Sequence, residues 1–159
     1  RQRQMCIRDS VGRNGQGVIG MRLKDKDQVI GMSLVNEGSL LLTITEKGYG
    51  KRANAGNYRL TKRGAKGVQN IKVDKKSGHV ISVTTPGDAN QILATTSSGK
   101  VIRTHIDTIR EIARVGRGVK VMSVDDDETV VAVALHNEDD EERNTDNGNP
   151  LPETDQETS

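Results

Sequence analysis

Aliphatic and polar residues alternate in short runs along most of the chain. The segments GVIGMRL, VIGMSLV, VISVTT and VVAVAL carry Val, Ile, Leu or Met at successive or alternate positions, and the polar turns KDKDQ, DKKSGH and DDDET separate such runs. Alternation over short lengths is typical of half-buried β-strands, whereas an amphipathic helix needs a longer run with a period of about 3.6 residues. The pattern therefore predicts short strands joined by tight turns.

One sequence motif occurs three times at a fixed spacing. GRNGQGVIGMRL begins at Gly12, KRGAKGVQNIKV at Lys62 and ARVGRGVKVMSV at Ala113, so that the Gly-Val pair recurs after 50 and then 51 residues. Farther along, LLTITEKGYGKR aligns with ILATTSSGKVIR, which places Gly48 on Gly99. Each unit is expected to form about four short strands, and periods of about 40 to 50 residues with four strands per unit are typical of propeller blades.

The composition agrees with an all-β fold. Phe and Trp are absent, there are two tyrosines, and 17 glycines suit many turns. A core of Val, Ile, Leu and Met suits short β-branched strands. One segment, IDTIREIARV, has Ile106, Ile109 and Ile112 at a spacing of three, which favours a helical turn. Its counterpart in the first unit, NAGNYRLTKR, lacks this pattern, so we expect residues 106–112 to form a loop or a short strand.

The glycines of the first motif also fit a nucleotide-binding fingerprint. Gly15, Gly17 and Gly20 have the G-x-G-x-x-G spacing that cradles a dinucleotide pyrophosphate at the start of a helix. That function requires a strand before the motif and an amphipathic helix after it, and neither is predicted here. Because the same corner recurs in each unit, we assign these glycines to turns that need a positive φ or a close backbone approach.

Charge is distributed unevenly along the chain. From Asp125 onward there are 13 acidic residues and one basic residue, Arg143, whereas the preceding part carries 23 Lys and Arg against nine Asp and Glu. A basic body favours a polyanionic partner, and an acidic tail can compete for the same surface. We expect the tail, residues 138–159, to be disordered because of its Asn, Gly, Pro and Thr content, and its EDDEE run is assigned to this tail and not to a metal site.

Basic residues recur at the turn that opens each motif. We call residues 12–17, 62–67 and 113–118 the first, second and third basic corners. Like charges repeated in register cost stability, and a polyanion that follows the row of corners would offset that cost. The predicted contacts to such a polyanion are, in first place, Arg13, Lys62, Arg63, Lys66, Arg114 and Arg117 and, in second place, Lys51, Arg52, Lys100 and Arg103.

Other chemistries have little support in the sequence. Cys6 is the only cysteine, which excludes a disulfide framework and favours a reducing compartment. No apolar run approaches the roughly 18 residues of a membrane span, and no signal peptide is visible, so we expect a cytoplasmic protein. His79, His105 and His136 are isolated, and no nucleophile, base and orienting group can be combined around them. We therefore predict no catalytic, cofactor-binding or metal-binding residue.

Several linked motifs, GYGKR, TKRGAKGVQNIKV, QILATTSSGKVIRT and the Gly-Val corners, share the fixed period. Together they resemble the C-terminal DNA-wrapping domain of bacterial DNA gyrase A, over about Val11 to Leu135. The resemblance implies a β-pinwheel, a propeller-like ring of about six blades with strands exchanged between neighbours and DNA wrapped around its basic outer face. Residues 1–10 then lie outside the family, the blades comprise 11–60, 61–111 and a partial 112–137, and the chain, which begins without Met, is expected to be a fragment of a longer protein.

The resemblance also implies a function. This function is sequence-nonspecific binding and wrapping of double-stranded DNA, in support of ATP-dependent negative supercoiling by a type IIA topoisomerase. The partners would be DNA, the rest of gyrase A and the second gyrase protein, gyrase B. ATP and Mg²⁺ would serve the whole enzyme, with no cofactor in this chain, and neither Tyr49 nor Tyr58 corresponds to its catalytic tyrosine.

Two alternatives remain at this point. The corresponding C-terminal domain of topoisomerase IV shares the fold and generally lacks the heptapeptide Q-R-R-G-G-K-G of the gyrase family, to which residues 61–67, TKRGAKG, are only related. The other alternative is a propeller-type scaffold that binds acidic proteins. DNA binding predicts sequence-independent affinity with a steep salt dependence, whereas a scaffold predicts dependence on one partner. As a further hypothesis, the acidic tail occupies the basic corners and weakens DNA binding.

Overall fold

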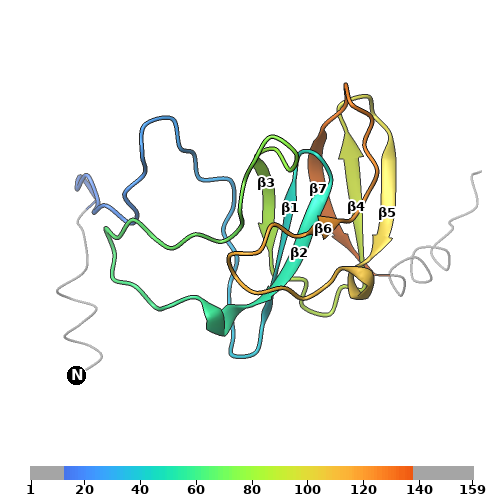
Figure 1. Ribbon diagram of the computed structural model, residues 1–159. Helices are drawn as coiled ribbons and strands as arrows, with labels where there is room; N and C mark the ends of the chain where they lie inside the picture. The colour runs from blue at the N-terminus through green and yellow to red at the C-terminus, as the bar shows by residue number, and fades with distance from the viewer. Residues whose placement is uncertain (1–12, 138–159) are drawn as a thin grey trace, which may run out of the picture.

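The computed structural model describes residues 13–137, and it consists of two antiparallel sheets that pack against each other (Figure 1). The four-stranded sheet has the order β3-β1-β2-β6, and the three-stranded sheet has the order β5-β4-β7. This confirms the predicted all-β class. Residues 1–10 and the acidic tail, 138–159, lie outside the described residues. The strands are β1 (Leu40–Thr45), β2 (Tyr49–Asn54), β3 (Val80–Thr84), β4 (Gln91–Thr96), β5 (Val101–His105), β6 (Val119–Lys120) and β7 (Val130–His136).

Each sheet combines strands from different sequence repeats. The first unit supplies the hairpin β1–β2, the second unit adds β3 beside β1, and the third adds β6 beside β2. In the same way β7, from the third unit, pairs with the β4–β5 hairpin of the second unit, with Leu93 opposite Ala134. One repeat therefore does not make one blade. The exchange of strands between neighbouring units agrees with the predicted pinwheel.

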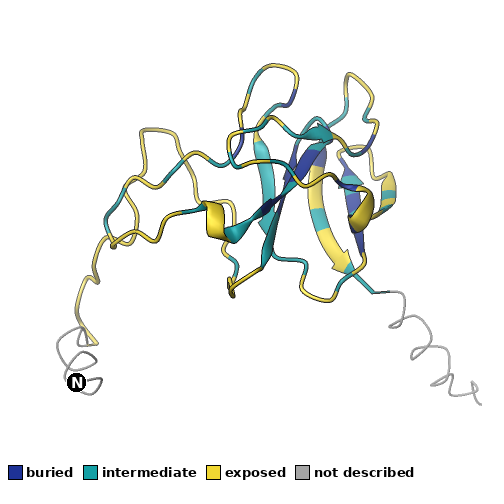
Figure 2. Ribbon diagram, turned by 60° about the horizontal axis from the view of Figure 1, so that its bottom comes forward, coloured by how far each residue is buried: buried dark blue, intermediate teal, exposed yellow. Residues whose placement is uncertain are grey.

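The first half of the first unit differs from the prediction. GVIGMRL and VIGMSLV were expected to form strands, but residues 13–35 contain only an isolated bridge between Met21 and Ala65. By the exchange seen elsewhere, a strand at 29–35 would need a β1-like partner from a preceding unit, and the described residues include no such partner. Met32 and Leu34 are accordingly 94% and 90% exposed. Figure 2 shows this segment as an exposed arm beside the two sheets.

The segment after β5 begins with a helical turn, so the prediction of a loop or short strand was wrong for residues 106–108, whereas residues 109–112 form a loop with one isolated bridge. Ile106–Thr108 form the 3-10 helix η2, which buries Ile106 and is followed by the buried Ile109. The first unit has a matching 3-10 helix, η1 (Ala55–Asn57), where the Asn54 side chain accepts a hydrogen bond from the Gly56 N–H at 2.8 Å. The isoleucine spacing was the correct signal.

The described residues contain no helix with the length and apolar character that a membrane crossing requires.

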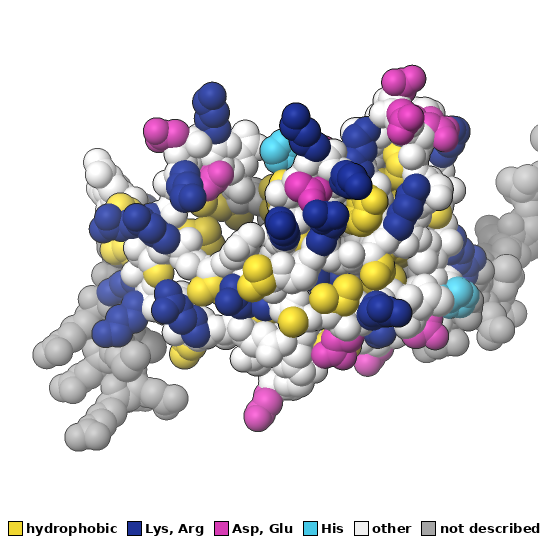
Figure 3. Space-filling view, viewed as in Figure 1, with side chains coloured by type: hydrophobic (Ala, Val, Ile, Leu, Met, Phe, Trp, Pro, Cys, Tyr) yellow, Lys and Arg dark blue, Asp and Glu magenta, His cyan; other side chains and the backbone are white. Residues whose placement is uncertain are grey.

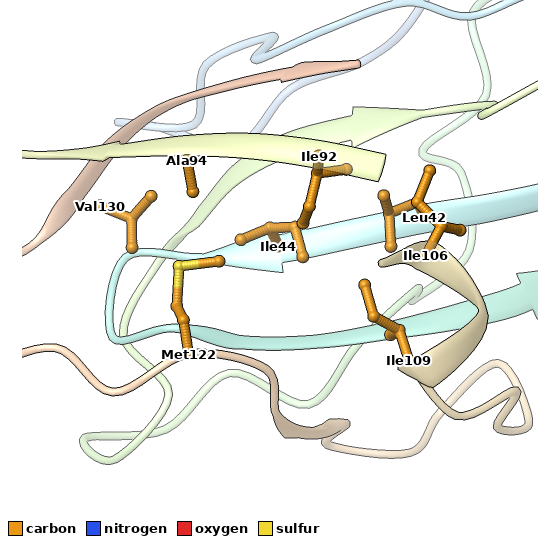
Figure 4. Packing of buried hydrophobic residues seen from close by; sticks show 8 residues of the cluster. All are labelled: Leu42, Ile44, Ile92, Ala94, Ile106, Ile109, Met122 and Val130. Carbon is orange, nitrogen blue, oxygen red and sulfur yellow. The ribbon is translucent and has the colours of Figure 1, made fainter. Parts of the chain in front are cut away.

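The core lies between the two sheets and is entirely aliphatic. Leu42 and Ile44 of β1 are fully buried and face Ile92 and Ala94 of β4 (Figure 4). Side chains from η2 and the third unit close the cluster at both ends. Because neither sheet alone covers its apolar face, the two blades stabilise each other. The remaining members of the cluster are Ile106, Ile109, Met122 and Val130.

The turn between β1 and β2 approaches the third unit so closely that it requires glycine. Gly48 has φ of 76°, and a Cβ atom on it would lie 2.5 Å from the Met122 carbonyl oxygen. The Gly48 carbonyl accepts a hydrogen bond from the Val121 N–H at 2.9 Å. Gly38 offers a comparison, because it has φ of 80° but no atom within 4 Å of the added Cβ.

We expect Gly48→Ala to lower the free energy of unfolding more than Gly38→Ala. Both replacements carry the left-handed backbone strain of about 1–2 kcal/mol, and only Gly48→Ala adds an overpacking cost of about 1–3 kcal/mol. Urea unfolding of the two variants, followed by circular dichroism, measures the difference. Equal losses of stability would contradict the close approach of this turn to Met122.

Candidate nucleic-acid interface

Lys and Arg side chains spread over the whole width of one face, whereas acidic side chains gather mainly at its upper right and along its lower edge (Figure 3). The residues predicted as contacts differ in their exposure. Lys51 is buried, and Arg52 and Arg114 are half-buried. The exposed ones are Arg13, Lys62, Arg63, Lys66, Lys100, Arg103 and Arg117.

The third basic corner is attached to the outer edge of β2 at both of its ends. Before the corner, the Ile112 N–H donates to the Arg52 carbonyl at 2.8 Å. After the corner, Val119 and Lys120 pair with Gly50 and Tyr49. Gly118 has φ of 95°, and a Cβ on it would lie 2.6 Å from the Gly50 carbonyl oxygen. Both ends of this corner are therefore held against the blade.

The second basic corner lies beside residues 20–22, which follow the first corner, and both segments lie away from the blades. The Gly64 N–H donates to the Gly20 carbonyl at 2.8 Å, and the Arg22 N–H donates to the Ala65 carbonyl at 3.0 Å. Gly17, Gly67 and Gly118 have φ of 76°, 78° and 95°, which confirms the predicted positive φ at this position. No atom lies within 4 Å of a Cβ added to Gly17 or Gly67, because no blade edge approaches them. For Gly20 the prediction was wrong, because it has neither a positive φ nor an atom within 4 Å of an added Cβ.

Two arginines connect the third corner with the segment that follows the second. The Arg114 guanidinium donates to the Gln69 carbonyl, and Arg117 forms an ion pair with Asp74 at 2.5 Å. Together with the bonds from the second corner to residues 20–22, these contacts connect the three motifs into one row, through the segments that follow the first and second corners.

The predicted surface position of Lys51 was wrong. It was predicted as a second-choice contact on the surface, but it is 0% exposed. Its Nζ atom donates to the carbonyl oxygens of Asn70 at 2.8 Å and Ala113 at 3.0 Å, and also to that of Arg114. Burial, and then the nearby Arg114 guanidinium, lower the pKa of Lys51. This side chain cannot reach an external polyanion.

Other second-choice residues are engaged within the protein. Arg52 Nε donates to the Ile109 carbonyl at 2.6 Å, and its Nη2 donates to the Asp107 carbonyl at 3.2 Å, so this guanidinium holds the η2 segment on β2. Arg103 Nε donates to Gln91 Oε1. The main role of Arg52 and Arg103 is therefore to stabilise their own blades.

Carboxylates already accompany two of the predicted cations. Lys100 pairs with Asp125 and Glu128, each at 2.9 Å, and hydrogen bonds from Lys100 to Asp125 and then to Glu128 raise the pKa of Lys100. Asp74 accompanies Arg117. The polar turn of the third unit therefore neutralises Lys100, which weakens its candidacy as a contact.

Sequence reasoning missed several polar residues around the corners. Asn70 accepts from the Tyr58 hydroxyl and donates from Nδ2 to Thr43 Oγ1 at 2.8 Å, so it fixes the segment after the second corner. No periodic signal marks Asn70, because its partners lie in other units. Exposed lysines beside the corners were also missed, although the charged run KVDKK offered a signal. They are Lys72, Lys75, Lys76 and Lys120. Within residues 13–137 no cluster of His, Cys, Asp and Glu could hold a metal ion.

We expect the carboxyl pKa of Asp74 to stay below its ordinary value even in the Arg117→Gln variant. The backbone N–H of Ser77 is the largest cause of the lowered pKa of Asp74, followed by that of Lys76 and then by the Arg117 charge. Arg117→Gln should therefore raise this pKa only in part. A ¹³C NMR titration of the carboxyl group measures it, and a return to the ordinary value would contradict the capping role. Since the folded-state pKa is lowered, this contribution to stability is present above about pH 4 and is lost as pH falls through the folded-state pKa.

Comparison with known proteins gives a consistent result along the chain. A family model described as "DNA gyrase C-terminal domain, beta-propeller" matches residues 9–36, 39–85 and 90–137. The DNA gyrase A protein of Haloquadratum walsbyi is 37% identical over 141 residues, which cover 87% of this chain and 16% of that protein. The DNA gyrase A protein of Fibrobacter succinogenes is 40% identical over 141 residues, covering 88% of this chain and 16% of that protein. This chain thus spans about a sixth of the length of these curated relatives.

Solved structures agree with the fold. A structure of the DNA gyrase A C-terminal domain matches with a TM-score of 0.68 and 35% identity, covering 76% of this chain and 41% of that one. The C-terminal domain of DNA topoisomerase IV matches with a TM-score of 0.67 and 21% identity, covering 75% of this chain and 38% of that one. At that identity the second match shows the fold alone.

Proposed function

Since the chain belongs to the family of the DNA gyrase C-terminal domain, we propose that it binds double-stranded DNA without sequence preference and bends the duplex along its basic corners. The observation that carries this proposal is the continuous row formed by the three corners. Hydrogen bonds join residues 20–22, which follow the first corner, to the second corner, and Arg114 and Arg117 join the third corner to the segment after the second. Exposed cations on linked turns suit a partner with evenly spaced phosphates.

The chemistry of the row favours contacts to phosphate and not to bases. The corners are turns that present Lys and Arg, and the described residues offer no long helix that could enter a major groove. Cations that neutralise phosphates release condensed counterions, which makes affinity depend on salt and not on sequence. Smooth bending of a 20–30 base-pair duplex by 40–90° costs about 1–6 kcal/mol, and successive corner contacts offset this cost.

The larger setting follows from the same family membership. In this proposal the chain acts as part of a type IIA topoisomerase, next to the rest of gyrase A and to gyrase B. Chiral wrapping of DNA would then support ATP-dependent negative supercoiling, with ATP and Mg²⁺ bound elsewhere in the enzyme. Gyrase is favoured over topoisomerase IV by 37% and 40% identity to gyrase A proteins, against 21% to the topoisomerase IV structure.

We expect Lys66→Gln to weaken binding to every duplex sequence by the same factor. Lys66 is exposed in the second corner and has the same repeat position as Arg117. Loss of one phosphate contact should reduce the slope of log affinity against log salt by about 0.9. Fluorescence anisotropy with random duplexes across a salt series measures both quantities for the full chain.

The matched control for this measurement is Lys24→Gln. It removes the same charge from the polar turn KDKDQ, where Lys24 is exposed and Asp25 and Asp27 lie close in sequence. Its slope should equal that of the unmodified chain. If the folded chain binds no duplex at low salt, or if affinity depends on one base sequence, the proposed function is wrong.

We expect Asp74→Asn to strengthen DNA binding. The Asp74 Oδ1 atom accepts from the N–H groups of Lys76 and Ser77, each at 3.0 Å, and asparagine keeps an acceptor at that place. The substitution removes the negative charge beside Arg117, so that a phosphate no longer competes with an internal carboxylate. The same anisotropy assay should show higher affinity and a steeper salt slope. Unchanged affinity would indicate that Arg117 does not contact DNA.

A further inference from the structure

We propose that Lys51 is a positioning residue that fixes the third basic corner relative to the segment after the second, and thereby sets the geometry of the cationic row. The effect on DNA rests on the proposed function, whereas the effect on the corner itself does not. Lys51 touches no external partner, since its side chain is fully buried. It acts on the corners through their backbone carbonyl groups.

The three contacts of Lys51 match the chemistry of an ammonium group. A lysine ammonium has three N–H donors and no acceptor. Here the Nζ atom lies 2.8 Å from the Asn70 carbonyl oxygen and 3.0 Å from that of Ala113, and it also donates to the Arg114 carbonyl. Within residues 13–137 it forms no ion pair with a carboxylate. The buried charge is therefore held by carbonyl groups alone.

These carbonyl groups come from two different repeats. Asn70 follows the second corner, and Ala113 and Arg114 begin the third corner, yet all three meet at a residue of the first unit. Lys51 thus connects three units at one atom. Arg52 extends the same attachment, because its guanidinium and backbone hold the η2 segment that leads into the third corner.

The second unit provides an internal comparison. The residue that aligns with Lys51 there is Ile102, which packs against the apolar core. Ile102 lies on β5, and the outer edge of β5 carries no corner among the described residues. The hairpin that holds a corner therefore has lysine at this position, and the hairpin without one has isoleucine. Ile102 thus serves the apolar core, whereas Lys51 donates to the backbone of other units.

The positions of the Arg114 and Arg117 side chains depend on the backbone of the third corner. With the carbonyl groups of Ala113 and Arg114 fixed, the Arg114 side chain reaches the Gln69 carbonyl and Arg117 reaches Asp74. Without the ammonium, the carbonyl groups of Asn70, Ala113 and Arg114 lose a charged donor, and the corner keeps its backbone attachments at Ile112 and Val119. The corner would then sample many positions, and its arginines would lose their fixed spacing.

The test is Lys51→Met, which keeps an unbranched side chain as far as Cε and removes the ammonium. Lys47→Met is the matched control, because Lys47 Nζ also donates to two backbone carbonyls, those of Asp126 at 2.8 Å and Glu128 at 3.2 Å, but away from the corners. In Lys51→Met the amide of Gly116, which donates to Ala113, should exchange with solvent at least about tenfold faster, while Lys47→Met leaves it unchanged. Equal exchange of this amide in Lys51→Met and the unmodified chain would overturn the proposal.

A double-mutant cycle separates positioning from general stability. Lys51→Met should weaken duplex binding in the unmodified background but change it by less than about twofold in Arg114→Gln/Arg117→Gln, where the positioned cations are gone. An equal loss in both backgrounds would contradict positioning. If the unmodified chain binds no duplex, the proposed function fails, and Gly116 exchange still decides the role of Lys51.

A measurement on the unmodified chain covers the case in which Lys51→Met does not fold. Three carbonyl acceptors should protect the Lys51 ammonium protons from exchange, so its ¹⁵Nζ resonance should be observable at neutral pH, unlike those of exposed lysines. An ammonium signal that exchanges as fast as the exposed ones would overturn the proposal. A protected signal supports it.

Discussion

The structure depends on one constraint, that the hairpins β1–β2 and β4–β5 are completed by strands from other repeats. β1 and β2 form a hairpin by themselves, but their outer edges are covered only by β3 and β6, which belong to the second and third units. Unpaired strand edges are costly and prone to association, so each unit is incomplete without its neighbours. The extended arm of residues 13–35 is consistent with this constraint. Its apolar segments have no strand edge to pair with, and they do not form strands.

Strand exchange also explains why basic side chains act inside the molecule. A chain without Phe or Trp has only small aliphatic side chains for its core, and the long turns between exchanged strands lie largely outside that core. Lys51, Arg52 and Lys47 compensate by donating to backbone carbonyls of other units. Such contacts to a charged donor are stronger than neutral hydrogen bonds. Cations thus take the role that aromatic packing has in many domains.

Sequence periodicity could predict what each repeat contains, but not how the repeats meet. The all-β class and the positive φ of Gly17, Gly67 and Gly118 follow from aligned positions, because turn chemistry is local. The burial of Lys51 does not follow, since its three partners lie 19, 62 and 63 residues away in other units. The 3-10 helix after β5 was missed because the alignment with the first unit was given more weight than the isoleucine spacing. In the structure both units contain a 3-10 helix at the same place.

The number of Lys and Arg residues therefore overstates the charge that a polyanion meets. Lys51 is buried, Arg52 is bound to carbonyl groups, and Lys100 faces two carboxylates, so these cations contribute mainly to the framework. The corner residues contribute differently, because a bent duplex has to be held at several fixed points to offset the bending cost. A few exposed cations on a rigid backbone serve that purpose better than many mobile ones, since ordering a flexible side chain or loop on binding costs entropy. The internal cations are then what makes the exposed ones effective.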